Sequence, residues 1–445
     1  MLELEKRIIN SFKNDSMFIT YDIKINNIIK AKLYYIECLV NLNLVGEVVI
    51  KKFKENESIY SFPNVKEIND YDEIINKIID GNVIIFDYEE GKISSIEIKS
   101  YFIRSIAEPD NEKIIKGPKE GFIESLFVNV HLLRNKLKRD DFKIEINDLN
   151  SLGSYRVGIM YLDKSVDNKA LRILRQRLKK IKKMKAIDIN FLREQIKDNK
   201  NSPFNTIGDT QRPDVCAFKL LEGKIILMVD GSPNAIYIPF LFSENFQTVD
   251  DYYTNFYYSS FNRIFRFLSF IFSITLPGLY VSLLVYHQEL LPVKLALSIS
   301  ASRQGVPFPT YLECLLLLTA FEVLREAGTK TSGLLGTSLS IVGALVIGQA
   351  TVEARIISTS VVIVVAATSV TSMINPKTSG LEIVFRYLFL LLGTVLGLYG
   401  LLCGILFLIM YLVKLKTFGK FYLSKVTSFK WKDYKKTYTR LPDEI

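Results

Sequence analysis

The chain is poor in the residues on which most catalytic and metal sites depend. Its 445 residues include only two histidines and four cysteines, which are Cys38, Cys216, Cys314 and Cys403. Their spacing contains no CxxC or Cys/His zinc pattern and gives no disulfide framework. No phosphate-binding loop is present, and neither histidine lies near a nucleophile motif. We therefore expect no metal, no cofactor and no enzymatic activity, and a membrane-anchored enzyme is the least favoured alternative.

Charge is also scarce in the last third of the chain. Residues 264–413 contain no Asp, and residues 387–413 contain no Asp, Glu, Lys, Arg or His. About 20 apolar residues are needed to cross ~30 Å of hydrocarbon as a helix. The apolar blocks predict four spans, with the last one long enough to tilt or to project from the bilayer. They are 264–286, 333–352, 356–374 and 383–413.

Residues 290–325 do not resemble an ordinary span, because they contain three prolines and five charged residues. Non-helical backbone at membrane depth is tolerated only where protein or water covers it, so we predict a re-entrant or in-plane element. Four spans plus this element place both termini on one side. The tail 414–445 carries nine Lys/Arg against three acidic residues, which is typical of a cytosolic juxtamembrane segment.

Residues 1–262 are nearly neutral, with 39 Lys/Arg against 38 Asp/Glu, so nucleic acid is not expected as a partner. They predict an α/β cytosolic N-terminal region of two subdomains, 1–110 and 111–262, followed by an α-helical polytopic membrane domain, 263–413. Expected strands are 32–40, 82–88, 155–161, 215–221 and 224–229. Expected helices are 71–80, 120–138, 168–184 and 189–198.

The few acids of the apolar half are candidate pore or gating residues, because burying a charge is costly unless it is paired or hydrated. Nine residues separate Glu313 from Glu322, so they face opposite sides of a helix, whereas Glu326 shares a face with Glu322, beside Arg325. A position at the water interface is the alternative. Glu353 is a further candidate, or belongs to a solvated helical hairpin.

Four glycines of the last span, Gly393, Gly397, Gly400 and Gly404, form two GxxxG patterns. This spacing indicates close helix packing, within one chain or between subunits.

Eight ordered sequence blocks extend from residue 104 to residue 328. They are RSIAEP (104–109), GPKEGF (117–122), TQRPD (210–214), VDGSP (229–233), DYY (251–253), HQELLP (287–292), SRQGVPFP (302–309) and FEVLREAG (321–328). Together they resemble the A-subunit family of bacterial spore germinant receptors, the GerA family. Gln211, Gln304, Arg355 and Ser358 depart from the pattern of that family.

The blocks contain further candidate residues. In the soluble half these are Arg104, Glu108, Arg212 and Asp230, although Asp230-Gly231 alone predicts a tight turn. In the loop between the first two spans they are His287, Glu289, Arg303, Pro307 and Pro309.

The resemblance implies a multi-pass subunit of the spore inner (cell) membrane with cytosolic termini. Such A subunits work with a nutrient-binding B subunit and a lipoprotein C subunit. They are thought to form homo-oligomers in the lipid that act as nutrient-gated channels for monovalent cations and start germination. A stage V sporulation AF-type paralogue, which amplifies germination without nutrient recognition, is an alternative. So is a secondary transporter, which would predict inverted repeats.

Overall fold

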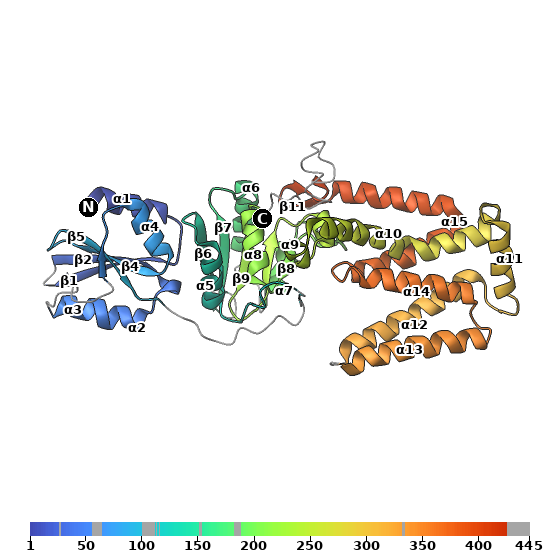
Figure 1. The fold of residues 1–445 in the computed structure, drawn as a ribbon. Helices are drawn as coiled ribbons and strands as arrows, with labels where there is room; N and C mark the ends of the chain where they lie inside the picture. Colours follow the sequence, from blue (N-terminus) through green and yellow to red (C-terminus); the bar gives the residue numbers. More distant parts are fainter. Residues whose placement is uncertain are drawn as a thin grey trace. The chain divides into compact units, whose positions relative to one another are not determined.

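The computed structural model describes residues 1–25, 28–55, 65–99, 112, 114, 116–150, 154–181, 188–331 and 334–424. Arg104, Glu108 and most of the basic tail lie outside these residues. The chain divides into two compact units (Figure 1). The α/β unit contains Met1–Phe240 and Lys416–Lys420, and the helical unit contains Leu241–Leu415 and the residues from Phe421 onward.

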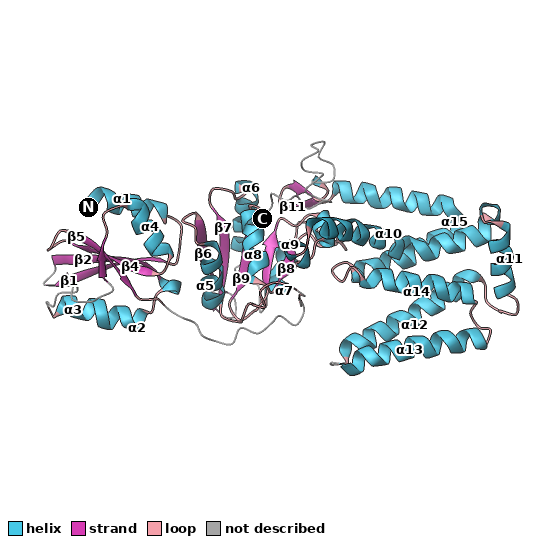
Figure 2. Ribbon diagram, in the orientation of Figure 1, coloured by secondary structure: helices cyan, strands magenta, loops and turns pink. Residues whose placement is uncertain are grey.

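The first sheet of the α/β unit is antiparallel, with the strand order β1-β2-β4-β5-β3. Figure 2 labels β1, β2, β4 and β5 of this sheet. Alternate residues of a strand point to opposite faces, and both faces are covered. Leu33 and Ile85 pack with Val49 of the segment that follows β2, while Tyr34 and Phe86 contact each other on the other face. The elements are α1 (Leu2–Ser11), β1 (Phe18–Ile25), β2 (Ile28–Ile36), α2 (Leu42–Leu44), α3 (Lys51–Lys54), β3 (Val65–Glu67), α4 (Tyr71–Ile79), β4 (Asn82–Asp87) and β5 (Lys92–Glu97).

The second sheet has the same strand order by position, β6-β7-β9-β10-β8. Its core joins strand residues such as Ile159 and Leu227 to Leu174 of α6 and Leu192 of α7. The elements are α5 (Leu126–Leu137), β6 (Phe142–Asn150), β7 (Ser154–Leu162), α6 (Asn168–Lys180), α7 (Ile189–Ile196), β8 (Gly208–Thr210), α8 (Pro213–Leu221), β9 (Ile225–Val229) and β10 (Ala235–Ile238).

Most predicted elements of this unit are confirmed, but three predictions are wrong. The segment 215–221 is part of helix α8 and not a strand, because Pro213 opens a helix whose residues are buried on nearly every side. The helix predicted from residue 120 begins at Leu126, since the Asn129 side chain bonds to the backbone of Ile123 and holds the preceding residues in a loop. The strand predicted to reach residue 40 ends at Ile36.

A buried carboxylate ties α1 to the first sheet. Glu5 accepts hydrogen bonds from the Lys32 ammonium and from the hydroxyls of Tyr34 and Tyr88. Burial acts to raise the pKa of Glu5, but the bonds from Lys32 and Tyr34 outweigh it and hold the pKa below its usual value of 4.5. A carboxylate with a lowered folded-state pKa stabilises the fold fully above its unfolded pKa. That contribution is lost as the pH falls through the folded-state pKa.

Glu5→Gln is therefore expected to lower the stability of the α/β unit at pH 7 by about 1–3 kcal/mol. The stability of the variant should also fall less than that of the wild type between pH 7 and pH 3. The measurement is the thermal unfolding of the detergent-solubilised chain between pH 3 and pH 7. Glu3→Gln, at an exposed position on the same helix, is the control. A wild-type pH profile in Glu5→Gln would contradict the assignment.

The second unit consists of helices that pack along one another (Figure 2). Among the described residues, two helices are long and apolar enough to cross a membrane, α10 and α15. The predicted count of four spans is therefore not confirmed; α14, with 15 residues, extends only about 22 Å. The main helices are α10 (Phe256–Tyr286), α11 (Val293–Ser302), α12 (Thr310–Lys330), α13 (Leu334–Glu353), α14 (Thr359–Met373) and α15 (Ser379–Lys414).

α15 is a helical hairpin and not one straight span. Gly397 has φ +62° and ψ −147°, a conformation outside the helical region that glycine adopts readily. A Cβ atom on Gly400 would lie 2.5 Å from the carbonyl oxygen of Leu392, and one on Gly404 would lie 3.0 Å from the ring of Phe389. These contacts are possible only if the chain reverses. The halves 379–396 and 398–414 are about 27 Å and 25 Å long, so residues 383–413 do not form the single continuous helix that the sequence predicts.

The helical unit begins and ends at the same place. The backbone N–H of Phe242 donates to the carbonyl oxygen of Tyr422 (3.1 Å), and the Asn245 side chain donates to the Tyr422 hydroxyl (3.0 Å). The rings of Phe242 and Tyr422 also meet edge to face, with their centres 5.8 Å apart. The segments that enter α10 and leave α15 therefore lie at one end of the helices.

Candidate functional site

A network of charges joins α10, α12 and α15, with Glu382 and Arg386 buried and Glu322 and Arg325 half-buried. Arg386, which is 1% exposed, donates from Nη1 to Oε1 of Glu322 (2.8 Å) and from Nε to the carbonyl oxygen of Ser273 (3.0 Å). The other carboxylate oxygen of Glu322 lies 2.9 Å from Nη2 of Arg325. A buried charge is stable only with such partners, so this cluster fixes three helices relative to one another.

Glu382 lies one helical turn before Arg386 and is fully buried. Its two oxygens accept hydrogen bonds from the hydroxyls of Thr378 and Ser273, each at 2.6 Å. We call Glu322, Arg325, Glu382 and Arg386 the buried charge cluster. The sequence pattern predicts Glu322 and Arg325 as site residues, but Glu382 and Arg386 were not predicted. The available signal was the Glu-x-x-x-Arg spacing at the start of an apolar run, which places both side chains on one helical face.

Glu313 belongs to a separate contact, at the first turn of α12. It is fully buried, and one of its oxygens accepts hydrogen bonds from both the backbone N–H and the hydroxyl of Ser358, each at 2.7 Å. The other oxygen lies 3.5 Å from Nε of Arg303, at the end of α11. Ser358 stands where proline would be typical of the family pattern. A proline at this position could not donate the backbone hydrogen bond.

The remaining candidate acids are exposed. Glu326 pairs with Lys330 one turn later (2.9 Å), and Glu353 accepts a hydrogen bond from Gln349 (2.9 Å). Exposed pairs of this kind contribute little to stability, about 0–1 kcal/mol. They are free to interact with water, ions or another subunit.

The predicted loop residues lie at helix ends. His287 ends α10, with its Nδ1 3.8 Å from the Glu289 carboxylate, and Pro309 directly precedes α12. Pro307 lies in the same loop between α11 and α12. Arg355 has φ +54°, a conformation that side chains other than glycine rarely adopt.

The four glycines of α15 have different surroundings. A Cβ on Gly393 would lie 2.5 Å from the carbonyl oxygen of Gly278 in α10, so two helix backbones touch there. Gly397 forms the turn of the hairpin, where the Tyr286 ring covers it. Gly400 and Gly404 pack against the first half of α15.

The two described candidates of the α/β unit make contacts that support the fold. Arg212 is fully buried and binds Asp214 through Nε (3.1 Å) and Nη2 (2.8 Å), while Nη2 also donates to the Pro118 carbonyl oxygen (2.6 Å). Asp230 accepts a hydrogen bond from the backbone N–H of Leu126 at the start of α5 (2.9 Å). Arg104 and Glu108 lie outside the described residues.

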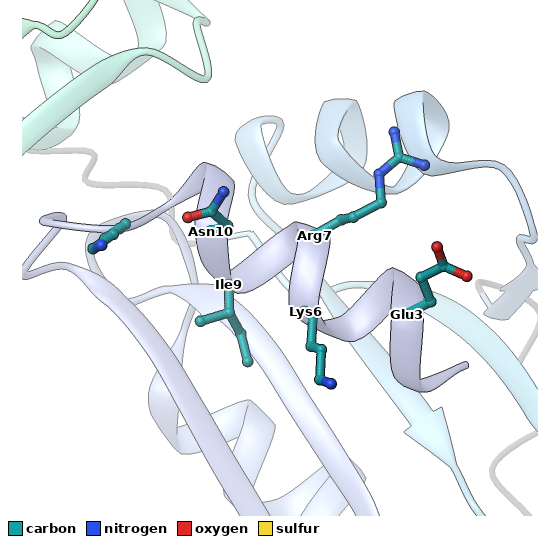
Figure 3. A pocket seen from close by; sticks show the side chains of 6 residues that line it. Glu3, Lys6, Arg7, Ile9 and Asn10 are labelled. Atoms are coloured by element: carbon teal, nitrogen blue, oxygen red, sulfur yellow. The ribbon is translucent and has the colours of Figure 1, made fainter.

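A surface hollow beside α1 offers no binding site of its own. Figure 3 shows Glu3, Lys6 and Arg7 pointing in different directions from this helix, and they do not converge on one point. The Arg7 guanidinium instead lies over the Tyr71 ring, 4.1 Å from its centre. In the described part of the chain, no group of three or more His, Cys, Asp or Glu residues is placed to hold a metal ion.

Comparison with known proteins agrees with the motif pattern. The family described as Bacillus/Clostridium GerA spore germination protein matches residues 6–444. The chain belongs to this family. The resemblance found in the sequence blocks is thereby confirmed, and membership in the GerA family implies a spore membrane protein that acts in germination.

Two relatives illustrate the extent of the similarity. Spore germination protein KA of Bacillus subtilis (strain 168) is 35% identical over 426 residues, covering 92% of this chain and 78% of the relative. Spore germination protein A1 of the same organism is 32% identical over 443 residues, covering 97% and 91%. A crystal structure of the N-terminal domain of the A subunit of the Bacillus megaterium spore germinant receptor GerK3 matches 54% of this chain and 94% of that domain, with 23% identity and a TM-score of 0.40.

Proposed function

We propose that this GerA-family protein is the A subunit of a spore germinant receptor. In this proposal it assembles with copies of itself and with B and C subunits in the spore inner membrane. The assembly forms a nutrient-gated path for monovalent cations. The observation that carries the proposal is the exposed apolar surface of α15, where Tyr399 and Phe407 are 71% and 70% exposed. Such a surface requires lipid or another subunit to cover it.

The proposal gives the candidate residues two kinds of role. Glu313 and Glu322 hold helix contacts inside one chain, so we assign them to gating: a helix movement must break or exchange their ion pairs. Glu326 and Glu353 are exposed acids at the ends of apolar helices, where they can attract cations to a path formed between subunits. Arg325 and Arg386 supply the positive charges of the buried charge cluster.

The proposed topology has both termini in the cytosol. The contact between Phe242 and Tyr422 supports this, because the helical unit is entered and left at one end. With the reversal at Gly397, the unit has an even number of helical passes, which are α10, α12, the shorter α13 and α14, and the two halves of α15. The proposed membrane domain remains 263–413, with a basic cytosolic tail from 414.

The test is cation flux into liposomes that contain the receptor assembled with its B and C subunits, measured with and without nutrients. We expect wild-type flux to rise with nutrient. Glu326→Gln and Glu353→Gln should each lower the preference for cations over anions at least twofold, because each removes one negative charge per subunit. Glu194→Gln, an exposed acid of the α/β unit, is the matched control.

Three results would each contradict a part of the proposal. Absence of flux in the wild-type assembly would reject the channel. Flux that does not depend on nutrient would reject nutrient gating and favour the stage V sporulation AF-type alternative. Unchanged selectivity in both glutamine variants would remove Glu326 and Glu353 from the path.

A further inference from the structure

The segment that follows α15 returns to the α/β unit. α15 ends at Lys414, and Leu415 alone separates it from Lys416–Lys420, which belong to the α/β unit. This segment is a tight hairpin of β11 (Lys416–Thr417) and β12 (Lys420–Phe421). Phe418 and Gly419 at its tip both have positive φ, +45° and +84°.

The tip of the hairpin is inserted into the core of the second sheet. Phe418 is 1% exposed and belongs to the same hydrophobic cluster as residues of α6 and α7. Its backbone N–H donates to Oδ2 of Asp198 (2.6 Å), and its ring lies under the Arg177 guanidinium, 4.7 Å from the ring centre. Arg177 also binds Asp198 and the carbonyl oxygen of Ile196, so α6 and the end of α7 hold the ring jointly.

Two further contacts fix the neighbours of Phe418. The Thr417 hydroxyl is buried and donates to the carbonyl oxygen of Thr206 (2.8 Å). Lys420 lies 3.2 Å from Asp167, whose carboxylate also caps the start of α6. Thr417, Phe418 and Lys420 therefore contact α6, the residues after α7 and the loop before β8.

We infer that Lys416–Lys420 form a clamp that transmits movement of α6 and α7 to the end of α15. One residue spans at most about 3.6 Å, so Leu415 allows Lys416 to move only a few ångströms away from the end of α15. If α6 and α7 shift by more than this, they must either pull the end of α15 or release Phe418 from the core. Release is unfavourable because it exposes a buried aromatic ring and leaves Asp198 without one of its donors.

The clamp can be tested by hydrogen exchange on the full chain in lipid nanodiscs. Phe418→Ala should accelerate exchange at least tenfold in two regions, residues 192–206 and the last turn of α15, residues 411–415. Phe421→Ala is the matched control, because Phe421 lies in the same hairpin but is 53% exposed, and it should leave both regions unchanged. Faster exchange in residues 192–206 alone would contradict the inference that the clamp transmits movement to α15.

A second variant separates the clamp from general unfolding. Asp198→Ala removes the acceptor of the Phe418 N–H without emptying the core, and it should accelerate the same two regions. Asp209→Ala, which removes an exposed partner of Arg193, is its control. If Asp198→Ala leaves the end of α15 unchanged, or accelerates exchange across the whole α/β unit, the clamp is rejected.

The consequence for gating rests on the proposed function, whereas the exchange test does not. Where the wild-type assembly conducts, Phe418→Ala should reduce the nutrient-dependent rise in flux at least tenfold, and Phe421→Ala should not. If Phe418→Ala gates normally with nutrient but exchanges faster at the end of α15, the clamp has no role in gating. That result would not contradict the proposed channel. Absence of wild-type flux would reject the proposed function and leave the exchange result to decide the clamp.

Discussion

Replacement of Gly278 or Gly393 by leucine is expected to prevent the helical unit from packing. A Cβ atom on Gly278 would lie 2.5 Å from the carbonyl oxygen of Phe389, and one on Gly393 would lie 2.5 Å from that of Gly278. Both obstacles are backbone atoms of a helix, which cannot rotate away as a side chain could. The cost should reach or exceed about 3 kcal/mol, the upper part of the range for overpacked cores.

The measurement is thermal stability and elution volume of the detergent-solubilised chain. Gly380→Leu is the matched control, since it lies in α15 and has no atom within 4 Å of its Cβ position. We expect Gly380→Leu to behave as wild type and the other two variants to aggregate or melt early. If all three melt as the wild type does, α10 and α15 do not approach each other in this way.

Much of the α/β unit could be predicted because its elements carry local signals. α4 shows buried isoleucines at helical spacing, a capping Asp70 and a closing Gly81, and its bounds differ from the prediction by one residue. β4 is a continuous apolar run that ends at a polar turn. Such signals fail where an element is buried all round: α8 shows no helical periodicity, so its run of apolar residues gave a false strand.

The hairpin of α15 could not be predicted from composition. An apolar run of 31 residues is compatible with one tilted helix or with two short ones, and only the conformation of Gly397 distinguishes them. GxxxG spacing is a helical signal, so it predicts that Gly397 and Gly400 lie at helix contacts. The sequence alone does not distinguish a glycine that adopts a positive φ from a glycine that packs at a helix contact.

The buried charge cluster shows the same limit for the site. The scarcity of charge in the apolar half predicts Glu322 as a site residue, and the structure pairs it with Arg325 and Arg386. Its partner Arg386 lies 64 residues away in the sequence, and a single sequence carries no signal for such a contact. Glu382 and Arg386 stand at the edge of an apolar block, where charged residues normally meet water.

Arg386→Met is expected to destabilise the helical unit by about 3–5 kcal/mol, the range for removing one partner of a buried ion pair. Methionine keeps an apolar side chain of similar length, so the loss reports on charge and not on a cavity. Glu322 would retain only Arg325, which is partly exposed, and Glu382 would lose its neighbouring positive charge.

Two further variants show whether the loss of stability in Arg386→Met comes from the broken ion pair or from any substitution in the helical unit. Arg325→Met removes the other partner of Glu322 and should cost less than about 1 kcal/mol, as expected for a partly exposed pair. Adding Glu322→Gln to Arg386→Met removes the stranded charge and should recover at least half of the lost stability. Thermal unfolding of the detergent-solubilised variants measures all three. Equal losses in Arg386→Met and Arg325→Met, or no recovery in the double variant, would show that the buried charge cluster does not hold α10, α12 and α15 together.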